Sequence, residues 1–113
     1  MSAAPDLNRQ LTLEAAVRLP DGAGGFSETW EPLGHIWAEL RAGSGREVAM
    51  QAGSKSRIAY RIFVRSARVG APSRPVPGQR FRDGARVFEI AAVTESNRSG
   101  RYLVCYSHEE AGL

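Results

Sequence analysis

The chain has 113 residues, of which 42% are hydrophobic and 24% are charged, a composition typical of one globular domain. No apolar stretch approaches the roughly 18 residues of a membrane span, and the N-terminus lacks the basic and apolar regions of a signal peptide. The sequence therefore predicts a small soluble domain that has no membrane contact. Its single cysteine, Cys105, favours an intracellular origin.

The formal net charge of +3 is distributed unevenly. From Lys55 to Arg86 there are nine basic residues and one acid, a balance of +8, whereas the remainder has six basic and eleven acidic residues, a balance of −5. This asymmetry indicates contact with a polyanion or an acidic protein surface. Alternatively, the arginines form bidentate ion pairs with acids on other strands or on neighbouring subunits.

The first half of the chain predicts two strands after a flexible N-terminal arm, residues 1–10. Residues 11–19 alternate apolar and polar side chains, as a half-buried strand does. Residues 20–25 are rich in glycine and predict a turn, after which residues 26–30 begin a return strand and Pro32 interrupts it. Residues 36–41 predict the next strand.

Residues 42–56 contain three glycines and no alternating pattern, so they predict a long inserted loop. Residues 57–65 are the clearest strand, with Ile58, Tyr60, Ile62 and Val64 on one face and arginines on the other.

The second half predicts an extended proline-rich linker and two more strands. Three prolines lie within residues 70–78, and Asp83-Gly84 predicts a tight turn. Strands follow at residues 86–93, with Phe88 and Ile90 inward, and at residues 101–106, before a short polar tail, residues 107–113. We therefore predict an all-β domain over residues 11–106, a small antiparallel β-barrel of about six strands with the long loop 42–56, since closure removes exposed edges.

No combination of residues predicts catalysis, a metal site or a cofactor. His35, Cys105 and His108 do not make a recognisable zinc spacing, since His35 is far from the other two in sequence. Cys105 lies among apolar residues and is predicted to be a packed thiol. Phe63, between Arg61 and Arg65, resembles the stacking platform of a single-strand nucleic-acid binder, and a stand-alone nucleic-acid-binding barrel is therefore the alternative function.

The order of these features resembles the head-tail joining proteins of tailed phages, also called head-tail adaptor or stopper proteins. The resemblance rests on the first strand and its glycine turn, Trp30, the Trp37-Ala38-Glu39 sequence, Glu47, and the later segments. Those later segments are residues 60–65, residues 80–84, Phe88-Glu89-Ile90 and Val93.

The resemblance implies a structural connector rather than an enzyme. Such a protein forms a homo-oligomeric ring in the virion or phage-like particle, made in the bacterial cytoplasm. The portal or adaptor lies on its head side, and a tail terminator or tail protein on its tail side. The ring lines the passage of the packaged double-stranded DNA without sequence specificity and helps to retain it, in a phage, a prophage or a gene transfer particle. Another connector component, such as a tail terminator, is the alternative within this class.

Two groups of residues are predicted to act in such a ring. Arg46 and Lys55, in the loop, are predicted to lie near DNA in the channel. The residues predicted to form intersubunit contacts are Arg57, Arg61, Arg65, Glu109 and Glu110.

Overall fold

The computed structural model describes residues 4–43, 49–52, 55–96 and 99–111, and these form seven strands. The strands are β1 (Arg9–Pro20), β2 (Phe26–Ala42), β3 (Ala49–Ala52), β4 (Lys55–Arg65), β5 (Arg80–Asp83), β6 (Arg86–Glu95) and β7 (Tyr102–Ala111). Every pairing is antiparallel. The prediction of an all-β antiparallel fold of about six strands is therefore confirmed. The described part of the chain contains no helix of the length and apolarity that a membrane span requires.

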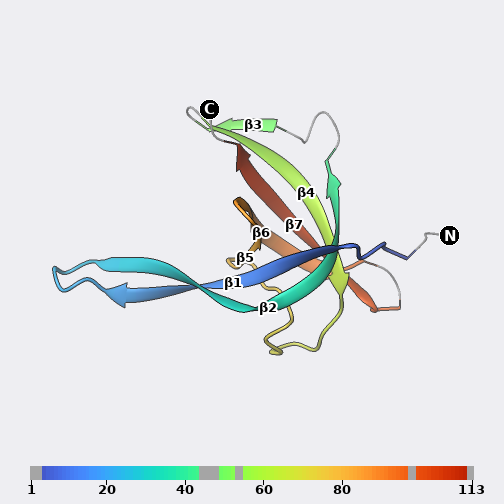
Figure 1. Cartoon of the computed structure of the whole chain (residues 1–113), viewed down its shortest axis with the longest axis horizontal. Helices are drawn as coiled ribbons and strands as arrows, with labels where there is room; N and C mark the ends of the chain where they lie inside the picture. The colour runs from blue at the N-terminus through green and yellow to red at the C-terminus, as the bar shows by residue number, and fades with distance from the viewer. Residues whose placement is uncertain (1–3, 44–48, 53–54, 97–98, 112–113) are drawn as a thin grey trace.

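The sheet closes on itself because β2 pairs along both of its edges. One edge pairs with β1, and on the other edge the last five residues, from Ala38 to Ala42, pair with β4. Hydrogen bonding then runs β1-β2-β4-β7-β6-β5 and returns to β1 (Figure 1). The six strands thus form a closed ring of pairings, which satisfies backbone groups that an open sheet would leave at its two edges.

The seventh strand, β3, continues the line of β2 along β4. Ala42 lies opposite Tyr60 and Ala49 lies opposite Ile58. Between these two pairs, the Gly43 N–H donates to the Ala59 carbonyl. The segment 42–56, predicted as a loop, therefore contains a short strand and the start of β4. A four-residue edge strand is too short to show an alternating pattern in the sequence.

Both predicted ends of the domain also lie partly in strands. β1 begins within residues 1–10, which were predicted to be a flexible N-terminal segment. β7 runs through most of residues 107–113, which were predicted to be a short polar tail. The N–H of Asp6 donates to the Glu39 carboxylate, and this bond, more than the neighbouring Arg41, lowers the pKa of Glu39. Polar residues at these ends are thus held by pairing and hydrogen bonds.

The core lies inside the closed sheet. Its buried members are Leu11, Leu13, Ala38, Ile62, Val64, Phe81, Phe88, Ile90, Leu103 and Cys105. The predicted inward positions of Phe88, Ile90, Ile62 and Val64 are confirmed, since none is more than 4% exposed. Cys105 is fully buried, as predicted for a packed thiol, and its burial raises its pKa to about 12.

The connection between β4 and β5, residues 66–79, packs against the sheet. It contains no strand or helix, as its prolines predict, but it forms consecutive turns rather than an extended linker. Pro75 is fully buried. Arg74 Nη1 donates to the Ala67 carbonyl over 2.7 Å, and the N–H groups of Gly78 and Ile90 donate to the carbonyls of Ile90 and Gln79.

β1 and β2 extend beyond the closed sheet as a two-stranded hairpin. We call this hairpin (residues 15–31) the arm from here on. β1 pairs with β5 only from Thr12 to Glu14, so nothing in the described chain pairs with the outer edge of its later residues. The arm projects far from the body (Figure 1). It explains the 55 × 34 × 22 Å extents and the radius of gyration of 15.2 Å, against about 13 Å for a compact domain of this length.

A β-bulge and an ion-pair cluster mark the base of the arm. Leu13 lies opposite Gly34 and Glu14 opposite Pro32, so Leu33 is the extra residue, and such a bulge bends and twists the strand. Glu14 is 7% exposed. Its Oε1 accepts from Arg80 Nε over 2.7 Å and its Oε2 from Arg82 Nε over 3.0 Å.

Arg80 extends this cluster to the arm, because its guanidinium lies 4.0 Å from the centre of the Trp30 ring. Burial alone raises the pKa of Glu14, but the hydrogen bonds and charges of Arg80 and Arg82 outweigh it and hold the pKa below its ordinary value. The ionised carboxylate therefore stabilises the folded chain where arm and ring meet.

Replacing Glu14 by Gln should destabilise the protein by about 1–3 kcal/mol at pH 7, because two arginines lose a charged partner. The lowered pKa means that this stabilisation is present above the unfolded value of 4.5 and is lost as the pH falls through the folded pKa. The gap between wild type and Glu14→Gln in urea unfolding should thus shrink below about pH 4.5.

The matched control is Glu28→Gln, an exposed arm residue for which the described structure records no ion pair. It should change stability little at either pH. A pH-independent gap for Glu14→Gln would show that the carboxylate is not held ionised by the two arginines.

The Cys105 thiol should be inert to a thiol reagent at pH 8 in the native protein and react at once in denaturant. The rise in its pKa from 9.0 to about 12 alone predicts reaction about a thousandfold slower, because the thiolate is the reacting species. Reaction of the native chain at the denatured rate would contradict its burial.

Candidate assembly surface

The described residues contain no group of three or more His, Cys, Asp or Glu side chains that could hold a metal ion. Among the described residues, each of the two histidines has one polar partner. His35 Nδ1 lies 3.3 Å from Thr12 Oγ1, and His108 Nε2 lies 3.0 Å from Glu89 Oε2. The described residues present charged and apolar surfaces instead.

Several arginines of the basic segment form ion pairs within the chain. Besides Arg80 and Arg82, Arg86 binds Glu109 through two hydrogen bonds, of 2.8 and 3.0 Å. These bonds raise the pKa of Arg86, more than burial lowers it. Arg57 lies 3.9 Å from Glu110. Three of the residues predicted to contact a neighbouring subunit, Arg57, Glu109 and Glu110, thus have partners in their own chain, in line with the second interpretation of the charge asymmetry.

Other arginines of this segment are exposed and could contact another molecule. Arg61, Arg65 and Arg68 are exposed, and the described structure records no ion pair for any of them. Arg61 lies between Arg41 on β2 and Tyr106 on β7, and the Arg65 guanidinium lies 5.8 Å from the centre of the Tyr102 ring. The predicted contact residues Arg61 and Arg65 therefore lie together on the outer face of β4, without an ion-pair partner among the described residues.

Phe63 does not form the exposed stacking platform that the sequence suggested. Only 9% of it is exposed, because Arg41 covers its ring at 4.7 Å and Val104 lies opposite on β7. A base could not stack on this ring without displacing Arg41. The observation that favoured a stand-alone nucleic-acid binder is thereby removed.

The channel residues predicted from the sequence cannot be placed in full. Arg46 lies outside the described residues, and Lys55 is placed only as the first residue of β4, with its side chain outside the description.

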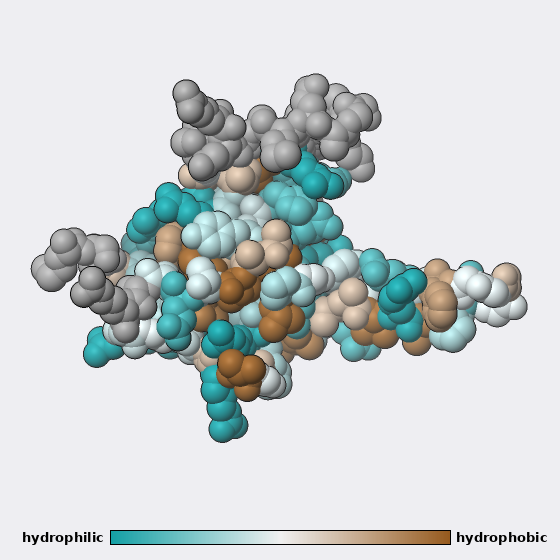
Figure 2. All heavy atoms as spheres, turned by 180° about the vertical axis from the view of Figure 1, so that it is seen from behind, coloured by the Kyte–Doolittle hydropathy of each residue, from teal (hydrophilic) through white to brown (hydrophobic). Residues whose placement is uncertain are grey.

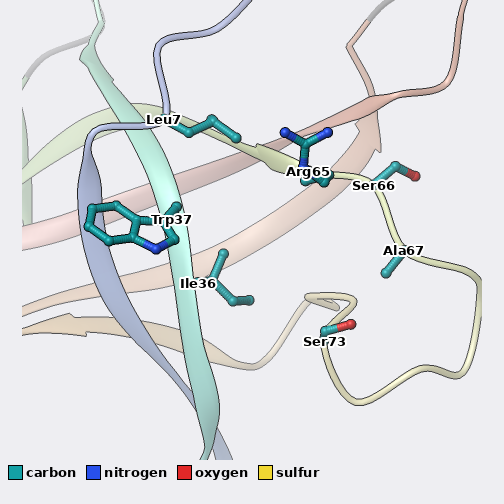
Figure 3. A pocket seen from close by; sticks show the side chains of 7 residues that line it. All are labelled: Leu7, Ile36, Trp37, Arg65, Ser66, Ala67 and Ser73. Carbon is teal, nitrogen blue, oxygen red and sulfur yellow. The ribbon is translucent and has the colours of Figure 1, made fainter.

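A groove opens where β2 separates from β4. Its volume is about 620 Å³, and it is lined by Leu7, Ile36, Trp37, Arg65, Ser66, Ala67 and Ser73. Figure 3 shows Ile36 on β2 pointing toward the connection that carries Ala67 and Ser73, with Arg65 at the end of β4. The groove is therefore apolar in part and basic at one end. Of its lining residues, the sequence predicts Arg65 as a contact residue, but not Leu7, Ile36, Trp37, Ser66, Ala67 or Ser73.

Large apolar side chains are also exposed on the arm and beside the groove. Leu19 is 51% exposed, Phe26 61% and Trp37 54%, and hydrophobic residues extend along the arm in Figure 2. For Leu19, the signal that could have identified it is the alternation of residues 11–19, which continues past the end of the core. Exposed apolar surface of this kind is typical of association sites.

Comparison with known proteins supplies the context for these surfaces. Residues 3–110 match the family model described as phage head completion protein. The fold is similar to a chain in the solved virion of a native gene transfer agent particle, with 50% sequence identity, a TM-score of 0.84, and coverage of 97% of this chain and 100% of that chain. The comparison with curated proteins found no match.

The family model covers nearly the whole chain. The resemblance to a phage structural family, inferred above from the order of the sequence features, is confirmed at that level. The chain belongs to the phage head completion protein family.

Proposed function

We propose that this protein is a structural subunit of the head-tail connector, of the stopper type, and that it assembles as a homo-oligomeric ring in a virion or phage-like particle. The observation that carries the proposal is the 50% identity, over 97% of the chain, to a chain of a gene transfer agent virion. In this proposal the ring lies between the portal or adaptor and the tail, and it surrounds the packaged DNA.

The surface of the chain supports a ring because it presents two unlike sides. Ring closure requires a heterologous contact, in which one surface of a subunit meets a different surface of the next. The outer face of β4 carries Arg61 and Arg65, for which the described part of the chain supplies no ion-pair partner, whereas the arm carries acidic and apolar residues. We propose that Arg61 and Arg65 meet acidic groups of a neighbouring subunit.

Charge reversal at Arg61 and Arg65 should impair assembly while leaving the fold intact, because both side chains are exposed. We expect the amount of the Arg61→Glu/Arg65→Glu chain in purified particles to fall at least roughly tenfold. A loss of about 1.4 kcal/mol in contact free energy is enough for that factor. Quantitative mass spectrometry of particles provides the measurement.

The matched control is Arg61→Lys/Arg65→Lys, which keeps the positive charges at the same positions and should retain most of the incorporation. Equal incorporation of the reversed and the wild-type chains, with equal melting temperatures, would exclude an electrostatic contact at these two arginines.

We propose contact with packaged DNA for Arg46 and Lys55, on the basis of their charge and of their position in the sequence on either side of β3. Such contact is with phosphates and carries no sequence specificity. The variant Arg46→Ser/Lys55→Ser should therefore give particles that contain the protein but lose more of their DNA during purification in high salt.

Arg101→Ser, which removes an exposed arginine far from this segment in the sequence, is the control and should retain DNA as wild type does. Full DNA retention by the double variant, measured as DNA per particle, would refute a role for these two residues.

A further inference from the structure

The apolar face of β1 continues beyond the part of the strand that packs in the core. Leu11 and Leu13 are 1% exposed and point into the closed sheet. Because side chains alternate along a strand, Ala15, Val17 and Leu19 lie on the same face of β1, but on the arm, where Leu19 is half exposed. This apolar face therefore extends onto the arm, beyond the core that the described residues form.

The backbone of the arm is also open for pairing. Among the described residues, the outer edge of β1 pairs only from Thr12 to Glu14 and the outer edge of β2 only from Ala38 onward. An isolated two-stranded hairpin is marginally stable in water, and open edges together with exposed apolar residues favour association with another chain.

The groove between β2 and residues 66–73 has the properties of a receiving site. Its volume of about 620 Å³ can hold several side chains, and Leu7, Ile36, Trp37 and Ala67 provide an apolar lining. Trp37 is half exposed in the free chain. Filling this groove would bury apolar surface on both partners, which is the main source of association energy.

The arm of the same chain cannot fill the groove. Phe26 at the tip and Ile36 at the groove are ten residues apart on one continuous strand, a separation of about 33 Å at 3.3 Å per residue. An arm that enters a groove must therefore come from a second chain.

Charge makes the two surfaces complementary. The arm contains Arg18 and the three acids Asp21, Glu28 and Glu31, a balance of −2. The stretch from Arg57 to Arg74, which includes the basic end of the groove, has five arginines and no acid, a balance of +5. Opposite potentials of this kind guide and orient association.

We infer that the arm of one copy of this chain inserts its apolar face and tip into the β2 groove of the next copy. This inference rests on the proposed function, since it names the contact that would link neighbouring subunits of the ring. The contact is heterologous, and repetition of it around an axis closes a ring.

Engineered disulfides test the contact directly. The full chain with Leu19→Cys/Ser73→Cys is produced in the particle-forming cell, and purified particles are oxidised. Cys105 is buried and should not interfere. We expect disulfide-linked dimers and higher multimers of the chain that disappear on reduction, whereas either single variant should remain monomeric. Co-expression of the two single variants should yield dimers but no higher multimers, because each copy then has only one engineered cysteine.

The outcomes separate the inference from the proposed function. If the double variant is present in particles at the wild-type amount but stays monomeric, or cross-links to a different particle protein, the arm does not occupy the groove of a second copy, and the connector function stands. If the wild-type chain is absent from particles, the proposed function itself fails and the inference with it.

A second pair of variants avoids dependence on disulfide geometry. Leu19→Ser/Phe26→Ser removes apolar side chains that are exposed in the free chain, so the fold should be preserved. We expect at least a tenfold loss of incorporation into particles. Val76→Ser, which removes an exposed apolar side chain outside the groove lining, should be incorporated as wild type. Normal incorporation of the arm variant would overturn the inference.

Discussion

The fold depends on the pairing of β2 with β1 along one edge and with β4 along the other. Without the five residue pairs between β2 and β4, the remaining strands would form an open sheet with the ends of the core exposed. The same strand begins at the tip of the arm and passes the groove before it reaches β4. One continuous strand of 17 residues therefore determines both the closure of the core and the distance between the two surfaces proposed for assembly.

The strands that carry an inward apolar face could be predicted from the sequence, because burial on one side imposes the alternation. This holds for residues 57–65 and 86–93, where Ile62, Val64, Phe88 and Ile90 are buried as expected. β3 and β5 have four residues each, too few for a pattern. β2 continues through Pro32 because that residue lies at a bulge, and because the other edge of β2 has no paired strand there in the described chain.

The candidate site was harder to predict because it depends on pairs of residues far apart in the sequence. Nothing local indicates that Glu14 binds Arg80, 66 residues later, or that Glu109 binds Arg86. Those ion pairs determine which arginines are free to contact another molecule. Arg86 is paired and Arg61 has no described ion pair, although both belong to one basic segment. The groove likewise forms only where β2 diverges from β4, and that point is fixed by the register of the closed sheet.

The cluster at the base of the arm has a mechanical consequence. Glu14, Arg80 and Trp30 form side-chain contacts between the arm and the closed sheet at the base of the arm, so they resist rotation of the arm about its base. The tip lies about six residues, or roughly 20 Å, beyond that base, and a rotation of about 10° there would displace it by roughly 3.5 Å. In the proposed ring, a displacement of that size would change the angle between successive subunits, so the rigidity of this joint would limit how many copies complete a turn.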